Sequence, residues 1–324
     1  MIKIKDLHEL PRVKDSLSYI YIEHAKIRQH GHSIAIYNQD GITPVPCATL
    51  NMIMLGPGTD ITHAAVKNLV ENDCLILWCG EQGVRSYAQG LGRTRSAKNV
   101  IYQAILCSIP KFRLLVAKKM YIMRFEDTIS FIASIKQLRG KEGARMRKVY
   151  IDNSTRTGVI WKGRSYKRDS WFSTDPINRA ISSANSCLYG MCHAAIVALG
   201  YSPALGFIHT GKQLSFAYDI ADLYKTEITI PLAFDIVSES TKNISKRVRL
   251  ASREYFRKHK FLKRIVKDIK TVLDIKEHLN SSEKRILDVN HLELRDYDTD
   301  DALPGYLWDP EQGFQEGGKN FDDS

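Results

Sequence analysis

Four residues with the chemistry of metal ligands lie in two segments of the chain. The segment GFIHTGKQLSFAYDIADLYK contains His209, Asp219 and Asp222, and the basic stretch QLRGKEGARMRK upstream contains Glu142. The two aspartates are three residues apart in a pattern typical of a helix, so their side chains project together. Two carboxylates held that close repel each other unless a cation or a proton lies between them. One imidazole with two or three carboxylates suits Mg²⁺ or Mn²⁺ better than zinc or copper.

A hard divalent ion in a cationic chain indicates phosphodiester chemistry on nucleic acid, because such an ion can polarise a phosphoryl oxygen and activate an attacking hydroxyl. The residues alone also allow a simpler interpretation. Asp222 can form a salt bridge with Lys225, three residues further on, and Glu142 can be an exposed ion pair among arginines. His209 lies where an apolar segment enters a turn, and a histidine there can be purely structural. It is the combination of the four residues that favours a metal site.

The charge of the chain indicates a polyanionic partner. Lys and Arg number 47 and Asp and Glu number 36 among 324 residues, which gives a net charge of +11. Residues 281–324 contain 12 acids and 4 bases, a net charge of −8, so the first 280 residues carry +19. A surface that basic attracts nucleic acid, and the binding weakens as salt is added. A basic surface that serves only solubility is the alternative.

The cysteines and the apolar runs indicate the environment of the protein. None of the six cysteines forms a CxxC motif and no matching histidine pair flanks them, so we do not expect a zinc site. Most lie in apolar runs and are expected to be small core residues in a reducing cytoplasm. The N-terminus MIKIKDLHEL lacks the apolar core of a signal peptide, and no apolar run approaches the roughly 20 residues that span a bilayer.

The elements that must position these residues change type near residue 90. SLSYIYIE, SIAIYN, ITPVP, NMIMLG, CLILWC and GVRSYAQ predict strands, and TDITHAAVKNLVEN predicts one short helix with Thr59 or Asp60 as its cap. The Gly-rich stretch AQGLGRTRSA marks a boundary. We therefore expect an α+β protein, with a β-rich, β-sandwich-like domain over residues 1–90 and an all-α catalytic domain over residues 91–280. The acidic tail over residues 281–324 has few packed apolar runs and is expected to be flexible in part.

The second domain shows helical patterns with recognisable ends. Pro110 is expected to start a helix, FIASIKQLRGKEGARMRKVYID predicts one long helix, and Asp175-Pro176 caps a helix that ends at Gly200. The segment SFAYDIADLYK predicts a helix whose buried face is set by apolar residues at helical spacing: Phe216, Ile220 and Leu223. The strongly cationic segment SKRVRLASREYFRKHKFLKRIVKDIKTVLD follows further on.

Four blocks of the sequence, taken in order, resemble one known family. LRGKEGARMR, INRAISSANSCLYG, GFIHTGKQLSFAYDIADLYK and VRLASR are similar to the CRISPR-associated integrase, the endonuclease that is protein one of the spacer-acquisition complex, in its subtype I-E. The resemblance extends from about residue 11 to residue 274. It implies a β-rich N-terminal domain, an all-α domain that carries the metal site, and a cytoplasmic prokaryotic protein of antiviral defence.

The resemblance also implies roles for the four residues. The family's metal ligands match Glu142, His209 and Asp222, and Asp219 matches a supporting acid, so these four form the expected catalytic set. The implied cofactor is Mg²⁺ or Mn²⁺. In the family's reaction, a DNA 3′-hydroxyl attacks a phosphodiester of the target strand, which inserts short duplex DNA into a CRISPR array. Because the substrate supplies the nucleophile, no catalytic serine or cysteine is needed.

The implied partners are double-stranded DNA with 3′ ends or overhangs, the DNA of a CRISPR array, and CRISPR-associated protein two. The family forms homodimers, and two dimers flank that smaller partner. Two alternatives stay open: a stand-alone metal-dependent nuclease that acts on branched DNA, and a DNA-binding scaffold whose acids merely pair with lysines. A requirement for a free 3′-hydroxyl separates an integrase from the nuclease. The scaffold predicts that Glu142→Ala and His209→Ala leave DNA activity intact.

Candidate DNA contacts lie on both sides of the metal residues. Arg85 matches a backbone-contact position of the subtype, and Lys212 and Lys225 flank the expected metal ligands. Tyr189 and Tyr218 can stack on a splayed strand near the site, or they can pack between helices instead.

A second group of basic residues follows from spacing. Lys246, Arg249 and Arg253 are three and four residues apart, which makes one cationic stripe on a helix and favours contact with phosphates. His24 stands where members of the subtype often carry an aromatic wedge at the end of a duplex. The acidic tail is not matched by the resemblance, and we expect it to dock on the partner subunit or to lie over the basic DNA surface.

Overall fold

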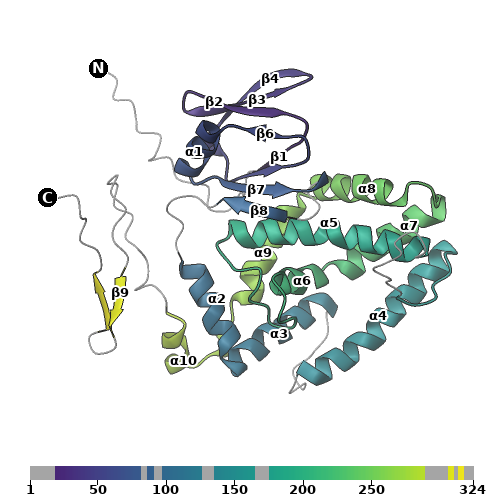
Figure 1. The fold of residues 1–324 in the computed structure, drawn as a ribbon. Helices are drawn as coiled ribbons and strands as arrows, with labels where there is room; N and C mark the ends of the chain where they lie inside the picture. Colours follow the sequence, from purple (N-terminus) through teal and green to yellow (C-terminus); the bar gives the residue numbers. More distant parts are fainter. Residues whose placement is uncertain are drawn as a thin grey trace.

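A β-rich part and a helical part lie one above the other (Figure 1). The computed structural model describes residues 19–81, 86–90, 97–125, 135–164 and 175–288, and the backbone of two further strands at 306–309 and 313–316. The β-rich part ends with a strand at Gly90, and the first helix of the helical part begins at Lys98. The predicted fold class, a β-rich region followed by a helical region, is confirmed.

In the described residues of the β-rich part there are two four-stranded sheets, one α-helix and a short 3-10 helix at Cys47–Thr49. The first sheet has the order β1-β5-β7-β8, in which β1, β5 and β7 run parallel and β8 runs antiparallel to β7. The second has the order β4-β3-β2-β6. The helix α1, His63–Glu71, contacts β2 and β3 of the second sheet and β7 of the first. The strands are β1 Tyr19–Ile22, β2 Lys26–His30, β3 Ser33–Asn38, β4 Gly41–Pro46, β5 Met52–Leu55, β6 Asp60–Ile61, β7 Leu75–Cys79 and β8 Ser86–Gly90.

The first sheet has a hydrophobic core on each of its faces. Successive residues of a strand point to opposite faces. In β5, Ile53 and Leu55 belong to the core shared with the second sheet and α1, whereas Met52 and Met54 belong to the core of the helical part. Because β5 and β7 are buried on both faces, NMIMLG and CLILWC are apolar without alternation. The sheet therefore joins the two parts through two packed cores.

The helix α1 begins later than we predicted. Its cap is Thr62, whose hydroxyl accepts a hydrogen bond from the Ala65 amide at 3.3 Å, and not Thr59 or Asp60. The reason is that Asp60 and Ile61 pair with β2 as the strand β6, so the backbone there is still extended. His24, the residue expected at the position of an aromatic wedge, is exposed in the bend between β1 and β2, at a φ of +51°.

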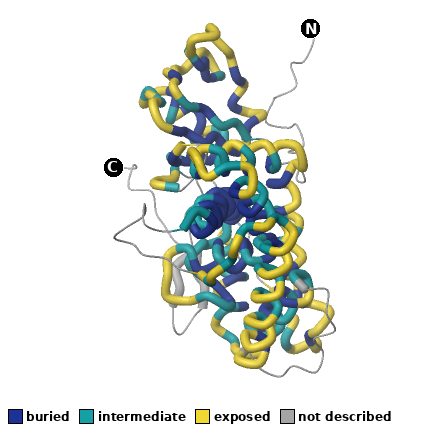
Figure 2. Tube along the Cα trace, turned by 90° about the vertical axis from the view of Figure 1, so that its right-hand side faces the viewer, coloured by how far each residue is buried: buried dark blue, intermediate teal, exposed yellow. Residues whose placement is uncertain are grey.

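The helical part is built around α5, Pro176–Ala198. As predicted, Asp175 caps this helix by accepting a hydrogen bond from the Asn178 amide at 2.7 Å, and Gly200 lies just beyond its end with a φ of +74°. The helices α6, α7, α8 and α9 all pack against it, and the buried residues gather in the middle of the molecule (Figure 2). The other helices are α2 Lys98–Ser108, α3 Pro110–Phe125, α4 Ile135–Thr157, α6 Ser215–Asp222, α7 Ile230–Glu239, α8 Ile244–Lys258, α9 Phe261–Leu273 and α10 Ser281–Ile286.

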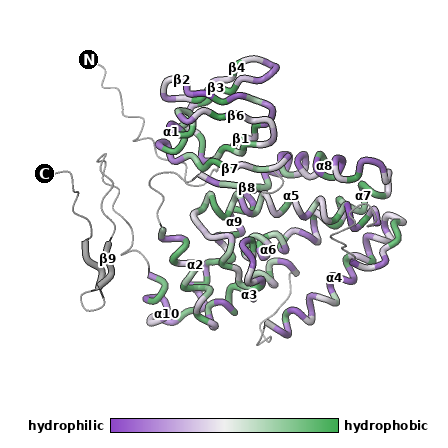
Figure 3. The backbone as a smooth tube through the Cα atoms, in the orientation of Figure 1, coloured by the Kyte–Doolittle hydropathy of each residue, from purple (hydrophilic) through white to green (hydrophobic). Residues whose placement is uncertain are grey.

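The cationic segment forms two helices, α8 and α9, which are separated at Lys260 by a left-handed backbone conformation with a φ of +47°. Along α8, much of the tube has the purple of hydrophilic residues (Figure 3). Part of the predicted acidic tail is ordered structure. Residues 281–286 form α10, which Asn280 caps and which an ion pair between Lys111 and Glu283 ties to α3 at 2.6 Å. The strands β9 Tyr306–Asp309 and β10 Gly313–Glu316 pair antiparallel, and the rest of the tail beyond Asp288 lies outside the described residues.

The six cysteines are free thiols, and all except the half-buried Cys107 are buried. Burial raises the pKa of the Cys79 thiol to about 12, which keeps it protonated and unreactive. No single helix among the described residues is long and apolar enough to cross a membrane. The helices α2 and α3 pass that test of length and composition only as a pair, across a bend of 100°.

The cap of α5 provides a test of the fold. Replacing Asp175 with Ala removes the acceptor of the Asn178 amide, so we expect the free energy of unfolding to fall by about 1 kcal/mol. Urea denaturation measures the change. The control is Asp152→Ala, because Asp152 is an exposed acid on α4 that pairs with Lys148 one turn away; it should change stability by less than about 0.5 kcal/mol. Equal losses in the two variants would contradict the assigned cap.

Candidate active site

Three structural elements carry the predicted metal residues, and a chain of ion-pair contacts links them. Glu142 lies on α4, His209 lies in the loop between α5 and α6, and Asp219 and Asp222 lie on α6. The orientation of α6 follows from its apolar side, which is buried as predicted: Phe216, Ile220 and Leu223. Residues that are far apart in the sequence thus meet beside one short helix.

The carboxylate of Asp219 holds the loop that carries His209. Its Oδ2 accepts hydrogen bonds from the amides of Phe207 and Ile208 at 2.6 and 3.1 Å, and its Oδ1 accepts one from the amide of His209 at 2.8 Å. Asp219 is 1% exposed, so these bonds satisfy a buried charge. A Cβ at Gly206 would lie 2.3 Å from the carbonyl oxygen of His209, so only glycine fits where the loop closes on itself.

Asp219 also orients the imidazole of His209. Nδ1 of the ring lies 2.7 Å from Asp219 Oδ1, which leaves Nε2 directed to the other aspartate, at 3.9 Å from Asp222 Oδ2. A histidine that donates from Nδ1 to a carboxylate presents the lone pair of Nε2, as metal-binding histidines commonly do. The hydrogen bond to Asp219, assisted by the charge of Asp222, outweighs burial and raises the pKa of His209 above its ordinary value. Both oxygens of Asp219 are thus engaged in positioning.

Two residues of α3 that were not predicted from the sequence hold Glu142. The hydroxyl of Tyr121 donates to Glu142 Oε2 at 3.0 Å, and Arg124 forms an ion pair through Nη1 with Glu142 Oε1. The same Nη1 lies 3.9 Å from Asp222 Oδ2. Tyr121 and Arg124 are three residues apart in the largely apolar stretch MYIMRF, and that spacing of two polar groups on one helix face was the available signal.

The salt bridge between Asp222 and Lys225, which the sequence analysis offered as the simpler alternative, is present. Lys225 Nζ lies 2.5 Å from Asp222 Oδ1 and 4.9 Å from the centre of the Tyr189 ring. Burial is the largest single influence and would lower the pKa of Lys225, but the charge of Asp222, the Tyr189 hydroxyl and the hydrogen bonds to both residues together outweigh it and raise that pKa above its ordinary value. The pair involves Oδ1, whereas Oδ2 of the same carboxylate faces His209 and Arg124. The two interpretations therefore use different oxygens of Asp222.

The donor atoms at this site suit a hard cation. One imidazole nitrogen and oxygens of two carboxylates, from His209, Glu142 and Asp222, are the types of ligand that Mg²⁺ and Mn²⁺ accept. Within the described part of the chain, no three histidine, cysteine or carboxylate side chains are close enough together to hold an ion. The guanidinium of Arg124 lies between the two carboxylates instead. The chemistry of the donor set fits a metal, and an internal cation stands among its members.

The predicted DNA contacts are divided between the site and the junction with the β-rich part. Lys212 and Lys246 are exposed. Arg249 pairs with Glu81 at 2.9 Å, and the guanidinium of Arg253 lies 5.4 Å from the centre of the Tyr21 ring. Two members of the cationic stripe therefore also contact the β-rich part, which the spacing alone did not predict. Arg85 lies outside the described residues.

The two predicted tyrosines pack together beside the site. The rings of Tyr189 and Tyr218 meet edge to face with their centres 4.8 Å apart, and Tyr218 lies 6.0 Å from the ring of His209. Both are half-buried, so each packs against protein on one side and keeps part of its surface accessible. This placement is compatible with both roles considered for them, helix packing and stacking on a strand.

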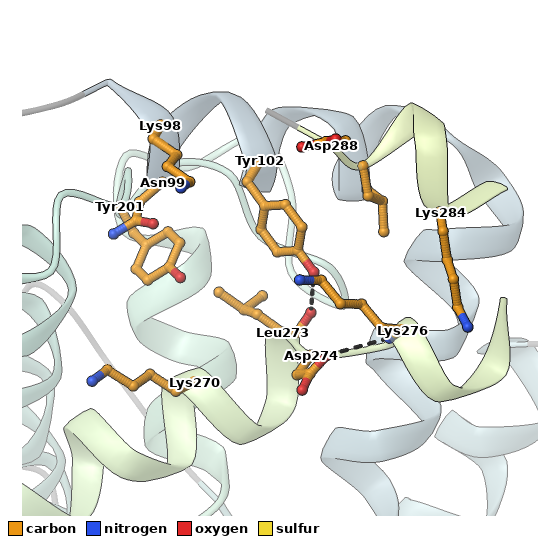
Figure 4. Close-up of a pocket in the computed structure, with 11 residues that line it drawn as sticks. Lys98, Asn99, Tyr102, Tyr201, Lys270, Leu273, Asp274, Lys276, Lys284 and Asp288 are labelled. Carbon is orange, nitrogen blue, oxygen red and sulfur yellow. Dashed lines mark hydrogen bonds between the residues drawn. The ribbon is translucent and has the colours of Figure 1, made fainter. Parts of the chain in front are cut away.

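A cavity of about 630 Å³ lies between α2, α9 and α10 (Figure 4). Lysines and two tyrosines line much of it, and the hydroxyl of Tyr102 donates to the Leu273 carbonyl there at 3.1 Å. Among the described residues, none of the predicted metal ligands or DNA contacts lines this cavity. The cavity is therefore separate from the candidate active site.

Comparisons with known proteins identify a single family. The family model "CRISPR associated protein Cas1" matches residues 18–133 and 121–270. A curated relative from Thermus thermophilus, "CRISPR-associated endonuclease Cas1 2", is 47% identical over 97% of this chain and 93% of its own length. The "CRISPR-associated endonuclease Cas1" of Escherichia coli K12 is 42% identical over 82% and 88%. A crystal structure of a TtCas1–DNA complex matches with a TM-score of 0.75 and 49% identity, covering 82% of this chain and 100% of that one.

The close approach at Gly206 generates a prediction. In Gly206→Ala, the new methyl group would collide with backbone atoms of His209 and Ser215, so we expect a loss of about 1–3 kcal/mol in stability. Urea denaturation measures it. The matched control is Gly140→Ala on α4, where a Cβ meets no atom within 4 Å; it should raise stability by about 0.5–1 kcal/mol. A neutral Gly206→Ala would show that the loop tolerates a shift of His209.

The contact between His209 and Asp219 predicts a titration. We expect Asp219→Asn to lower the pKa of His209 toward its ordinary value of 6.5, because the main cause of the raised pKa is removed. The hydrogen bond between His209 and Asp219 stabilises the folded protein fully at pH values below the pKa that His209 has in the unfolded chain. This stabilisation is lost as the pH rises through the higher pKa that His209 has in the folded protein. NMR titration of the imidazole signals in EDTA measures both proteins, with the half-buried His193 as an internal reference. An unchanged pKa of His209 would contradict the assigned hydrogen bond.

Proposed function

This chain belongs to the CRISPR-associated Cas1 family, and we propose that it is a divalent-metal-dependent DNA integrase of spacer acquisition. The observation that supports this most is the convergence of Glu142, His209 and Asp222 from separate segments, with both carboxylates beside one cationic group. The names of the relatives, which are CRISPR-associated endonucleases, agree with the breakage of phosphodiester bonds.

The proposed reaction is a transesterification. The 3′-hydroxyl of a short duplex attacks a phosphorus of the target strand and forms a new phosphodiester bond. The bond from that phosphorus to the 3′ oxygen of the target strand breaks, and the departing oxygen takes up a proton. The number of phosphodiester bonds is unchanged, so the step needs no external energy source. The nucleophile belongs to the DNA, which agrees with a site that contains acids, a histidine and cations.

Each residue of the site has a defined task in this proposal. Glu142, Asp222 and Nε2 of His209 are the groups that would hold Mg²⁺ or Mn²⁺, which supplies Lewis-acid activation of the phosphoryl group and of the hydroxyl when bound. Asp219 keeps Nδ1 of His209 occupied and so fixes the direction of Nε2. Lys225 balances the charge of Asp222 on its other oxygen.

Duplex DNA with 3′ ends and the DNA of a CRISPR array are the proposed substrates. A relative that is 49% identical was crystallised as a DNA complex, which supports nucleic acid as the ligand. The exposed Lys212 and Lys246 are the contacts that require no rearrangement, whereas Arg249 would have to leave Glu81 or contact phosphate with its remaining donors. The proposal includes Arg85 as a further contact.

The proposal extends to the assembly. Because the chain resembles subtype I-E of the family, we propose that it forms homodimers and that two dimers flank CRISPR-associated protein two. The contacts between Arg249 and Glu81 and between Arg253 and Tyr21 hold the β-rich part on α8, so both parts of the chain enter the assembly as one body. The acidic tail is proposed to contact the partner or the basic surface. A deletion that tests this should remove residues 289–324 and keep α10, because α10 is capped by Asn280 and paired with α3 through Lys111 and Glu283.

A stand-alone nuclease that acts on branched DNA is the second candidate, because the same residues could activate water in place of a 3′-hydroxyl. The word endonuclease in the names of the relatives is the observation that favours it. The two candidates differ in one requirement, since only the integrase needs a free 3′-hydroxyl on a second DNA.

An insertion assay tests the proposed function. The purified chain, its presumed partner, a labelled duplex and a supercoiled plasmid with a CRISPR array are mixed with Mg²⁺ or Mn²⁺. We expect the label to join the plasmid, and His209→Ala to reduce the joining at least roughly 100-fold, because Nε2 is one of the three groups that bind the ion. His63→Ala, at an exposed position on α1, is the matched control.

A duplex with 3′-deoxy ends separates the two candidates. Loss of joining with these ends identifies the 3′-hydroxyl as the nucleophile. Cleavage of branched DNA by the chain alone, with no joining under any condition, would favour the nuclease. Joining that survives in both His209→Ala and Glu142→Ala would reject the site itself.

A further inference from the structure

Arg124 lies at the point where the expected ligand atoms converge. Its Nη1 forms an ion pair with Glu142 Oε1 and lies 3.9 Å from Asp222 Oδ2. That oxygen of Asp222 is also 3.9 Å from Nε2 of His209. We propose that Arg124 is the internal counter-ion of the metal-free site, which holds Glu142 and Asp222 together and competes with the metal for them. This inference rests on the proposed metal-dependent function.

Burial makes this arrangement stronger than a surface ion pair. The side chain of Arg124 is 6% exposed, that of Glu142 is 22% exposed and that of Asp222 is 16% exposed. Charges so poorly solvated need a partner, and removing one partner leaves the other uncompensated. Nη2 of Arg124 also contacts the sulfur of Met146 at 2.9 Å, and Tyr121 donates to the second oxygen of Glu142. The guanidinium is therefore held by two residues of α4, Glu142 and Met146, and Tyr121 of α3 holds the Glu142 carboxylate in turn.

The nearby Lys225 does not have the same position. It lies on Oδ1 of Asp222, on the side of the Tyr189 ring, and leaves Oδ2 to face His209. A metal held through Oδ2 is compatible with Lys225 in place. Arg124, in contrast, takes Oε1 of Glu142 and lies near Oδ2 of Asp222, the oxygen that also faces Nε2 of His209.

The balance of charge has a consequence for metal affinity. Glu142 and Asp222 are matched by Arg124 and Lys225, so the four residues carry no net charge. A dication that approaches this set meets two bound cations as well as two carboxylates. The ion must therefore displace the guanidinium of Arg124 when it binds. The binding free energy is reduced by the free energy needed to break the ion pair between Arg124 and Glu142.

Titration of the full-length protein with Mn²⁺ tests the inference, with isothermal calorimetry as the readout. We expect Arg124→Gln to tighten Mn²⁺ binding roughly tenfold and to lower the melting temperature in EDTA, because the two carboxylates then lack their counter-ion. Arg124→Lys keeps the charge and should retain wild-type affinity. Weaker Mn²⁺ binding in Arg124→Gln, or equal affinity in all three proteins, would overturn the inference.

The matched control is Arg156→Gln. Arg156 also forms an ion pair, with Asp235 at 2.7 Å, but it lies at the C-terminal end of α4, away from Glu142, and is half-exposed. Its replacement should leave Mn²⁺ affinity unchanged. Asp222→Asn identifies the site that is titrated. Mn²⁺ binding that does not depend on Asp222 would overturn the metal site and this inference together, whereas binding that depends on Asp222 but not on Arg124 would overturn this inference alone.

If Arg124→Gln does not fold, the wild-type protein can be used in a different measurement. Phenylglyoxal modifies accessible guanidinium groups, and mass spectrometry locates the modified arginines. Because Arg124 is buried in its ion pair, we expect slow modification in EDTA and a several-fold faster reaction once Mn²⁺ displaces it, with Arg156 as the internal reference. Modification of Arg124 that slows or stays constant on addition of Mn²⁺ would contradict displacement.

Discussion

The geometry of the site depends on one buried carboxylate. Asp219 accepts hydrogen bonds from three consecutive amides, at residues 207–209, and from the imidazole of His209. A single side chain therefore sets both the path of the loop and the direction of the ring that the loop carries. An apolar side chain could not take the place of Asp219, because the three buried amides that donate to it would then have no acceptor. Gly206 completes the arrangement by allowing the backbone to approach the carbonyl of His209.

The frame around this loop is one packed body. The sheet β1-β5-β7-β8 places Ile53 in the core of the β-rich part and Met52 in the core of the helical part, so the two cores share one layer. Contacts from Arg249 to Glu81 and from Arg253 to Tyr21 extend that junction to the surface. A domain held by a continuous core is not expected to swing freely, unlike one joined by a small polar interface.

The sequence predicted most reliably what local chemistry determines. Asp175 and Pro176 signal the start of α5 without any knowledge of the rest of the chain, whereas the start of α1 was misplaced because β6 pairs with a strand from another segment. The same limit applies at the site. The residue types and spacing indicated Glu142, His209 and both aspartates, and only the family resemblance favoured Asp222 over Asp219. The role of these residues as ligands stays a prediction. Arg124 escaped notice because its pair with Glu142 joins two different helices, α3 and α4. The spacing of Tyr121 and Arg124 along α3 marks a polar position but does not identify the partner on α4.

The formal charge of +19 on the first 280 residues overstates the positive charge that is available to DNA near the site. Arg124, Lys225 and Arg249 each pair with a carboxylate of the protein itself. A phosphate that recruits one of these cations must replace that carboxylate, so the gain is smaller than for a cation in contact with water. The salt dependence of binding counts the phosphates that the protein newly neutralises. We therefore expect exposed residues such as Lys246 to account for most of the salt dependence of DNA binding. The cations that are paired within the protein contribute less to it than their formal charge suggests.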